Sequence, residues 1–337
     1  MAAIRAAEPA APVLLPPGPV MLAIDGLALS DVDRQRLLHP LVGGIVLFAR
    51  NYRSVSQLRA LTASLRALRS PALLIATDHE GGRFQSFRKG FTPIGPMRRL
   101  GHLWQRDPLA ACQQATSIGR TIGGQLRRVG VDLAFGPVLD LDHARSGIIG
   151  DRAFDADPRV VAMLGRCLAH GLLLAGMANC GKHFPGHGFA AADSHETLPL
   201  DPRPLRTLLR EDAAPYRWMG DTLLSVMPAH VVYPRVDSQP ATYSRVWLRD
   251  ILRDRLGFTG LVISDDLSMA AALGAGPITT RARRALAGGC DMVLALQREE
   301  ADQLLAGRLR WKAARHFHDR LAAVRSPGAA PSGPSRP

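Results

Sequence analysis

The sequence contains eight short apolar runs, and each of them is followed by a longer stretch that can form a helix. In the stretch 54–69, Leu58, Leu61 and Leu65 recur at three- and four-residue steps while arginines occupy the other face, a spacing typical of an amphipathic helix. Strands that alternate with helices predict a parallel sheet, because parallel neighbours need a crossover segment between them. The eight predicted strands span residues 20–24, 44–48, 72–77, 131–135, 177–182, 222–227, 261–264 and 292–296.

An open doubly wound sheet and a closed eight-stranded barrel both satisfy this alternation. Eight units within about 300 residues, without a G-x-G-x-x-G turn, favour the barrel. We therefore predict an α/β fold that consists of one (β/α)8 TIM-type barrel in a single domain. Because both ends of the chain are rich in Ala, Pro, Ser and Gly, the predicted parts are a flexible N-terminal segment (1–18), the catalytic barrel (19–305), a C-terminal helix (306–325) and a disordered tail (326–337).

The composition argues against several classes of partner. The formal net charge of +13 comes almost entirely from arginines spread along the chain, and no zinc-finger spacing or RNA-binding motif accompanies them, so we expect no nucleic-acid partner. No apolar run reaches the length of a membrane span, and the N-terminus lacks the apolar core of a secretory signal, so we expect no membrane partner and a cytoplasmic location. Four cysteines without a C-x-x-C pair favour reduced thiols over disulfides or a zinc knuckle. We also expect a monomer.

Chemically distinctive residues follow five of the predicted strands. Asp25 follows the first strand, DHEGGR (78–83) the third, KHFPGHG (182–188) the fifth, MPAH (227–230) the sixth and SDDLSM (264–269) the seventh. The active sites of such barrels are built from the loops at the carboxyl ends of the strands. The sequence therefore predicts one site, at that end of the barrel.

The stretch KHFPGHGFAAADSHETLP (182–199) admits three interpretations. His183, His187 and His195 could bind a metal, but the intervening Pro and Gly residues exclude the regular helix that would make their spacing meaningful. A polar loop whose histidines bind backbone carbonyls is a plainer alternative. Asp193 and His195 favour proton transfer, because residues i and i+2 on extended backbone point the same way and a carboxylate keeps an imidazole oriented and protonated. We predict no metal and no cofactor.

Two acids after the seventh predicted strand are candidates for the partner of that proton-transfer group. Asp265 would face the cavity at the end of the strand, and Asp266 would satisfy the amides of the helix that follows. An ordinary helix N-cap is the alternative for either residue, since Ser or Asp before an apolar helical run commonly has that role.

A crevice lined with hydrogen-bonding groups is also expected. Asp78 stands directly at a strand end, and the glycines after it allow a sharp turn over the barrel mouth; a tight turn with no chemical role is the alternative. Such a crevice suits a polyhydroxylated ligand, so carbohydrate is the expected substrate class. The residues expected to line it are Asp78, Arg152, Lys182 and His183.

Together these motifs resemble glycoside hydrolase family 3, and more narrowly its single-domain bacterial β-N-acetylhexosaminidases. The resemblance implies a retaining β-glycosidase on a (β/α)8 barrel that releases terminal N-acetylglucosamine through a covalent glycosyl-enzyme. It also implies a role in the cytoplasmic recycling of cell-wall fragments, the anhydro-muropeptides. The likeness extends from about Pro19 to about Leu305 and rests on DHEGGR with Gln85 and Phe87, GDRAF (150–154), KHFPGHG followed by DSH, PAH and SDDLSM.

The resemblance implies roles for individual residues. Asp265 would attack the anomeric carbon. His195 would protonate the leaving oxygen and later deprotonate water, with the support of Asp193. The hydroxyls of the sugar would be bound by Asp78, Arg152, Lys182 and His183, while His187 and Asp266 would have supporting roles.

The sequence departs from the family pattern at Ser86, where these enzymes usually carry an arginine. A weaker affinity for the sugar with the chemistry intact is the expected consequence, and Arg88 is a candidate replacement. Three other functions fit parts of the pattern: an N-acetylglucosaminide phosphorylase on the same fold, a sugar-binding protein without catalysis, and a metal-dependent hydrolase.

Overall fold

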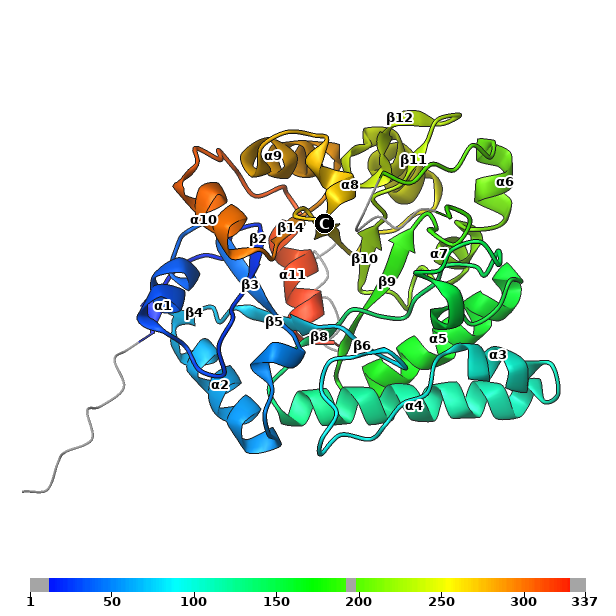
Figure 1. The fold of residues 1–337 in the computed structure, drawn as a ribbon, viewed down its shortest axis with the longest axis horizontal. Coiled ribbons are helices and arrows are strands. Elements are labelled where there is room, and N and C mark those ends of the chain that lie inside the picture. The colour runs from blue at the N-terminus through cyan, green and yellow to red at the C-terminus, as the bar shows by residue number, and fades with distance from the viewer. Residues whose placement is uncertain (1–11, 192–197, 328–337) are drawn as a thin grey trace, which may run out of the picture.

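The computed structural model describes residues 12–191 and 198–327, and its centre is a closed barrel of eight parallel strands (Figure 1). Neighbouring strands follow the order β10-β13-β14-β2-β3-β5-β8-β9, and the pairing of β9 with β10 closes the ring. Each strand overlaps one of the eight predicted runs, so the predicted (β/α)8 barrel is confirmed. The barrel strands are β2 (Val20–Ala23), β3 (Val42–Leu47), β5 (Leu74–Thr77), β8 (Leu133–Ala134), β9 (Ala178–Phe184), β10 (Ser225–Pro228), β13 (Leu261–Asp266) and β14 (Met292–Ala295).

Helices pack around the outside of the barrel between successive strands. In α2 (Val55–Ala67), the side chain of Ser54 caps the first turn, and Leu58, Leu61 and Leu65 are buried against the sheet as their spacing predicted. Burial of each leucine contributes about 1.5–3 kcal/mol. The other helices are α1 (Asp31–Leu37), α3 (Arg98–Trp104), α4 (Pro108–Arg128), α5 (Pro158–Leu174), α6 (Leu205–Arg210), α7 (Ala214–Trp218), the π-helix η4 (Val246–Arg255), α8 (Ala270–Leu273), α9 (Ile278–Gly288), α10 (Arg298–Ala306) and α11 (Phe317–Arg325).

Short elements occupy several of the loops at the carboxyl end of the barrel. One antiparallel pair follows β5 and another follows β10, so the loops that carry DHEGGR and MPAH have a defined backbone. These elements are the pair β6 (His79–Gly81) and β7 (Phe84–Gln85), the pair β11 (Val232–Tyr233) and β12 (Asp237–Pro240), and the 3₁₀ turns η1 (Ala49–Asn51), η2 (Gly150–Arg152) and η3 (Ala241–Tyr243).

The interior of the barrel is filled with side chains and covered at its amino end by α11. Phe317, Leu321 and Val324 of this helix join a buried cluster of strand residues that includes Leu74, at the start of β5. Figure 1 shows α11 in the middle of the ring of strands. The carboxyl ends of the strands are therefore the open end of the barrel, where the sequence predicts the site.

The C-terminal helix is shorter than predicted. The range 306–325 was expected to be helical throughout, but α11 begins only at Phe317. In the segment before it, Leu309 is buried and Trp311 and Ala313 are partly buried, while the residues between them are exposed. This period of two is typical of extended backbone, with alternate side chains packed beneath the barrel.

Part of the predicted flexible N-terminal segment is fixed to the barrel. Within the expected range 1–18, β1 (Val13–Leu14) pairs in parallel with β4 (Arg69–Ser70). The buried guanidinium of Arg69 donates a hydrogen bond of 2.6 Å to the carbonyl of Leu15. Residues 1–11 and the predicted tail from 328 onwards lie outside the described residues.

The helices of residues 12–191 and 198–327 do not include one that combines the length and the apolar character needed to cross a membrane.

Candidate active site

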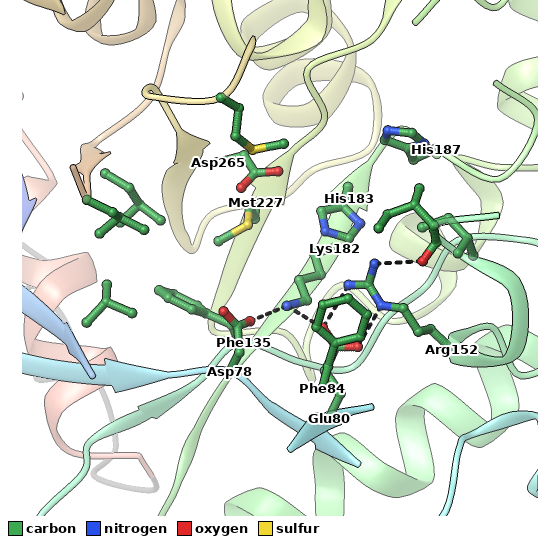
Figure 2. Close-up of a pocket in the computed structure, with 16 residues that line it drawn as sticks. Asp78, Glu80, Phe84, Phe135, Arg152, Lys182, His183, His187, Met227 and Asp265 are labelled. Carbon is green, nitrogen blue, oxygen red and sulfur yellow. Dashed lines mark hydrogen bonds and ion pairs between the residues drawn. The ribbon is translucent and has the colours of Figure 1, made fainter. Parts of the chain in front are cut away.

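A cavity of about 100 Å³ lies at the carboxyl end of the barrel, within the part of the chain that the structure describes. Figure 2 shows Asp265 on one side of it, facing Lys182, His183 and Asp78. Aliphatic, aromatic and methionine side chains form the apolar part of the wall. The predicted residues Asp78, Arg152, Lys182, His183, His187 and Asp265 all line this cavity, together with Glu80, Phe84, Phe135, Met227 and Met269.

A network of paired charges forms one wall of the cavity. Lys182 Nζ lies 2.5 Å from Asp78 Oδ1 and 2.6 Å from Glu80 Oε1. Arg152 binds the same Glu80 carboxylate with two hydrogen bonds, at 2.9 Å from Nε and 2.8 Å from Nη2. Two parallel hydrogen bonds fix both the position and the plane of a guanidinium group. The four side chains therefore present a fixed set of donors and acceptors.

The charges of this network are stabilised by one another. Burial by itself would raise the pKa of Glu80, but the adjacent Arg152 and Lys182 hold it well below its usual value. Burial would lower the pKa of Lys182, but Asp78 and Glu80 raise it above the ordinary value. Glu80 and Lys182 are therefore both ionised at neutral pH, which suits the binding of hydroxyl groups.

A second buried carboxylate, Asp140, orients the two histidines of the KHFPGHG loop. Asp140 Oδ2 lies 2.7 Å from His183 Nδ1, and Oδ1 accepts hydrogen bonds from the backbone amides of His183 (3.3 Å) and His187 (2.7 Å). The carboxylate favours a proton on His183 Nδ1, which leaves Nε2 as the ring atom available to a ligand. The ring nitrogens of His187 have no hydrogen-bond partner among the described residues, and burial lowers its pKa.

The two acids at the end of β13 point in different directions, as the sequence suggested. Asp265 lines the cavity, and its Oδ1 accepts a 2.8 Å hydrogen bond from the amide of Asp266. Asp266 Oδ1 instead accepts hydrogen bonds from the amides of Ser268 (3.0 Å) and Leu296 (3.3 Å). These amides belong to loops rather than to a helix, because α8 begins only at Ala270.

The same two acids have opposite pKa shifts. Burial would raise the pKa of Asp265, but the nearby His183 and His230 lower it, so that its net shift is downwards. For Asp266, burial and the negative charge of Asp265 raise the pKa to about 6. Near neutral pH, Asp265 is the fully ionised carboxylate that faces the cavity.

His230, from the MPAH motif, supports the end of β13. Its ring is buried, and Nε2 lies 3.0 Å from the backbone carbonyl of Asp266, to which it donates. The histidine therefore links the loop after β10 to the backbone of the two acids.

Two of the predicted site residues, Asp193 and His195, lie outside the described residues. The chain is described on both sides of them. Before them, the guanidinium groups of Arg145 and Arg203 lie over the ring of Phe189, at 4.3 and 4.2 Å from its centroid. After them, the carbonyl of Pro199 accepts a 3.0 Å hydrogen bond from the amide of Val232.

The structure does not support Arg88 as a substitute for the arginine that is missing at Ser86. Arg88 is exposed, and its Nη2 donates to the carbonyls of Gly82 (2.8 Å) and Arg83 (3.3 Å) instead of lining the cavity. The hydroxyl of Ser86 donates to the carbonyl of Asp78. That suggestion from the sequence is therefore wrong, because the loop backbone holds Arg88 at the surface.

Sequence reasoning missed Glu80 and Asp140. Glu80 belongs to the DHEGGR motif, where its i, i+2 spacing from Asp78 indicates the same face of an extended chain. Asp140 follows the fourth predicted strand, the position at which other strands carry the site residues. Both signals are present in the sequence. In residues 12–191 and 198–327, no group of three or more His, Cys, Asp or Glu side chains is arranged to hold a metal ion.

Comparison with known proteins gives consistent matches. The model of the glycosyl hydrolase family 3 N-terminal domain matches residues 19–312. The β-hexosaminidase of Bordetella avium is 59% identical over 297 residues, 87% of this chain and 85% of that protein. The β-hexosaminidase of Aromatoleum aromaticum is 54% identical over 313 residues, 92% of this chain and 88% of that protein. NagZ from Neisseria gonorrhoeae in complex with N-trifluoroacetyl-D-glucosamine is 45% identical, with a TM-score of 0.89 over 94% of this chain and 92% of that one.

Proposed function

This chain belongs to glycosyl hydrolase family 3 and is a hydrolase of the β-hexosaminidase type, and we propose that it releases terminal N-acetylglucosamine from anhydro-muropeptides by double displacement. The observation that carries the proposal is the position of Asp265, an ionised carboxylate at the end of β13, across a small cavity from a wall of hydrogen-bonding groups. A sugar bound to that wall would present its anomeric carbon to the carboxylate.

The sugar is held by the charged wall. Asp78 and Lys182 would bind hydroxyl groups with an acceptor and a donor, Arg152 would add further donors, and His183 Nε2 would accept one hydrogen bond. Because Glu80 and Asp140 fix these side chains before the ligand arrives, little side-chain entropy is lost on binding. The complex of gonococcal NagZ with N-trifluoroacetyl-D-glucosamine supports an N-acylated glucosamine as the ligand.

Asp265 is the nucleophile of the proposed reaction. Since Oδ1 is held by the amide of Asp266, Oδ2 is the oxygen free to attack the anomeric carbon. The bond to the leaving oxygen breaks as the new bond forms, through an oxocarbenium-like transition state. A covalent glycosyl-enzyme divides one difficult displacement into two easier ones.

His195 and Asp193 complete the mechanism as the acid/base pair. In the first step, His195 would donate a proton to the leaving oxygen. In the second, it would take a proton from the water that attacks the glycosyl-enzyme and releases Asp265. These two roles rest on the sequence motif and the family resemblance. The proposed setting is the cytoplasmic recycling of cell-wall fragments.

The proposal is tested with 4-nitrophenyl N-acetyl-β-glucosaminide, over a range of phosphate concentrations, with identification of the sugar product. We expect free N-acetylglucosamine, released first as the β-anomer, and a turnover that Asp265→Asn lowers by several orders of magnitude. The exposed Asp254 supplies a matched control as Asp254→Asn.

Other outcomes of this assay would identify the alternatives. A sugar 1-phosphate as the main product would show a phosphorylase. Equal inactivity of the wild type and Asp265→Asn, with retained binding of N-acetylglucosamine, would show a sugar-binding protein. An α-anomer as the first product would contradict double displacement. The same measurement on an anhydro-disaccharide peptide tests the proposed natural substrate.

A further inference from the structure

Two of the four cysteines lie on neighbouring helices outside the candidate active site. Cys112 belongs to α4 and Cys167 to α5, and both are partly exposed free thiols that pack at the edge of the core. Figure 1 shows α5 beside α4 on the outside of the barrel. Neither thiol lines the cavity that contains Asp265, so the proposed reaction uses neither of them.

The two helices touch through their backbones. A methyl group at Gly119 of α4 would lie 2.1 Å from the carbonyl oxygen of Leu168 in α5. One turn further on, a methyl group at Gly123 would lie 3.2 Å from the carbonyl oxygen of Leu172. A step of four residues along α4 therefore matches a step of four along α5, so the helices run parallel in a fixed register. Their axes lie closer together than the usual distance of about 8–10 Å.

This register places the two thiols opposite each other. A methyl group at Gly171 of α5 would lie 2.1 Å from the carbonyl oxygen of Thr116 in α4. Cys167 lies four residues before Gly171, and Cys112 lies four residues before Thr116. Residues four apart share one face of a helix, so the thiols occupy equivalent positions one turn from the contact. A disulfide requires Cα atoms about 4.4–6.8 Å apart, which helices in backbone contact can satisfy.

The surroundings of Cys167 agree with this adjacency. Burial and the neighbouring thiol of Cys112 raise the pKa of Cys167 to about 11, while the hydroxyl of Thr116 and the guanidinium of Arg166 act in the opposite direction. Because the thiolate is the nucleophile, this thiol reacts slowly at neutral pH and faster as the pH rises.

The other two cysteines are poor competitors. Cys180 lies in β9 and Cys290 lies just before β14, and both are buried. Burial raises the pKa of both thiols. Thiols buried in apolar surroundings are inert towards oxidants in solution. Oxidation should therefore select the pair on α4 and α5.

We propose that Cys112 and Cys167 form a redox modification site, at which a low-molecular-weight disulfide such as oxidised glutathione joins α4 to α5 by a reversible disulfide bond. The thiolate of one cysteine attacks a sulfur of the oxidant, forms a mixed disulfide and releases one glutathione thiolate. The thiolate of the other cysteine then attacks the protein sulfur of the mixed disulfide and releases the second glutathione. The two protein thiols lose two electrons, the oxidant gains them, and the two protons end on the glutathione thiols.

The experiment incubates the full chain at micromolar concentration with excess oxidised glutathione at about pH 8.5, near the ordinary pKa of a thiol. Unreduced peptides are then mapped by mass spectrometry. We expect the wild type to become lighter by two hydrogen atoms, to yield one linked peptide pair that contains Cys112 and Cys167, and to recover its free thiols in dithiothreitol. Cys112→Ser and Cys167→Ser should stop at the mixed disulfide. Cys290→Ala, which removes a thiol outside the pair, is the control and should form the link as the wild type does.

The link should also raise the Tm of the wild type by roughly 5 °C, because it closes a long loop of the unfolded chain. The same treatment should leave the Tm of the two serine variants unchanged. The proposal is overturned if the wild type keeps both thiols free, if glutathione stays on either thiol without a link, or if the bond forms between two chains. Linked peptides that contain Cys180 or Cys290 would overturn it as well. These outcomes are measured on the wild type, so a serine variant that fails to fold does not affect the test.

Discussion

The charged side chains of the cavity are held in position by one another and not by the sugar that they are proposed to bind. Glu80 holds Arg152 and Lys182, and Asp140 holds His183. Buried charges are tolerated when they are paired, and the loss of one partner leaves an uncompensated charge in a low-dielectric surrounding. Two residues with no proposed contact to the substrate therefore decide whether the contacting residues are in place.

Replacement of Glu80 tests this dependence. In Glu80→Gln, two buried cations lose the carboxylate that they share, so we expect a loss of about 3–5 kcal/mol in the free energy of unfolding. We also expect kcat/KM to fall roughly 10- to 100-fold, mainly through KM, because the sugar-binding groups lose their fixed orientation. Denaturant unfolding and steady-state kinetics measure the two effects, with Asp254→Asn as the exposed control. A variant with normal KM would refute the positioning role.

The raised pKa of Asp266 predicts a specific pH dependence of stability. Its folded-state pKa of about 6 lies above the ordinary value of 3.8, so between these values the folded protein binds more protons than the unfolded chain. Stability from this group is therefore present at low pH and is lost as the pH rises from about 4 to about 6.

The variant Asp266→Asn removes this titration while its side-chain oxygen can still accept from the amides of Ser268 and Leu296. Relative to the wild type, we expect its free energy of unfolding to gain roughly 1–3 kcal/mol between pH 4 and pH 7. Urea unfolding at both pH values measures the change. A difference between variant and wild type that does not vary with pH would rule out the raised pKa.

At the level of elements, the barrel strands were predictable because buried parallel strands are continuous apolar runs, and the helices between them show a clear period. The extended conformation of the segment before α11 was not predictable, because its apolar residues at 309, 311 and 313 occur within a stretch rich in good helix formers. Only the barrel end against which they pack requires the extended conformation. Local preference and tertiary packing disagree there, and packing prevails.

The contact between α4 and α5 shows what sequence periodicity does not reveal. A methyl group at Gly119 of α4 would lie 2.1 Å from the carbonyl oxygen of Leu168 in α5, so the two backbones touch at this glycine. We expect Gly119→Ala to separate the helices and to cost about 1–3 kcal/mol in the free energy of unfolding.

The same helix contains a matched control for this prediction. At Gly124 an added methyl group would meet only the far end of Arg128, at 4.0 Å. Gly124→Ala should therefore stabilise the protein by about 0.5–1 kcal/mol through helix propensity. Thermal or urea unfolding compares the two variants. Effects of the same sign would contradict the close backbone contact.

Over the whole molecule, the packing of α11 lies at one end of the barrel and the residues of the candidate site lie at the other. The position of the site could be predicted because polar motifs follow the strands, and the motifs whose residues the structure describes lie at the open end of the barrel. What could not be predicted is how the side chains pair, as in the Glu80 and Asp140 contacts, since pairing depends on distances between segments far apart in the chain. Within the described part of the chain, the amino end, covered by α11, carries none of these groups.

This separation predicts that Phe317→Ala destabilises the protein without impairing catalysis. Phe317 is fully buried beneath the barrel, so its truncation leaves a cavity that should cost about 3–5 kcal/mol. The proposed nucleophile and sugar-binding groups lie at the opposite end, so kcat/KM on the chromogenic glycoside should stay within about twofold of the wild type below the melting temperature. Lys312→Ala, at an exposed position of the same region, should change neither quantity. A folded Phe317→Ala variant with a tenfold lower kcat/KM would show that the two ends of the barrel are coupled.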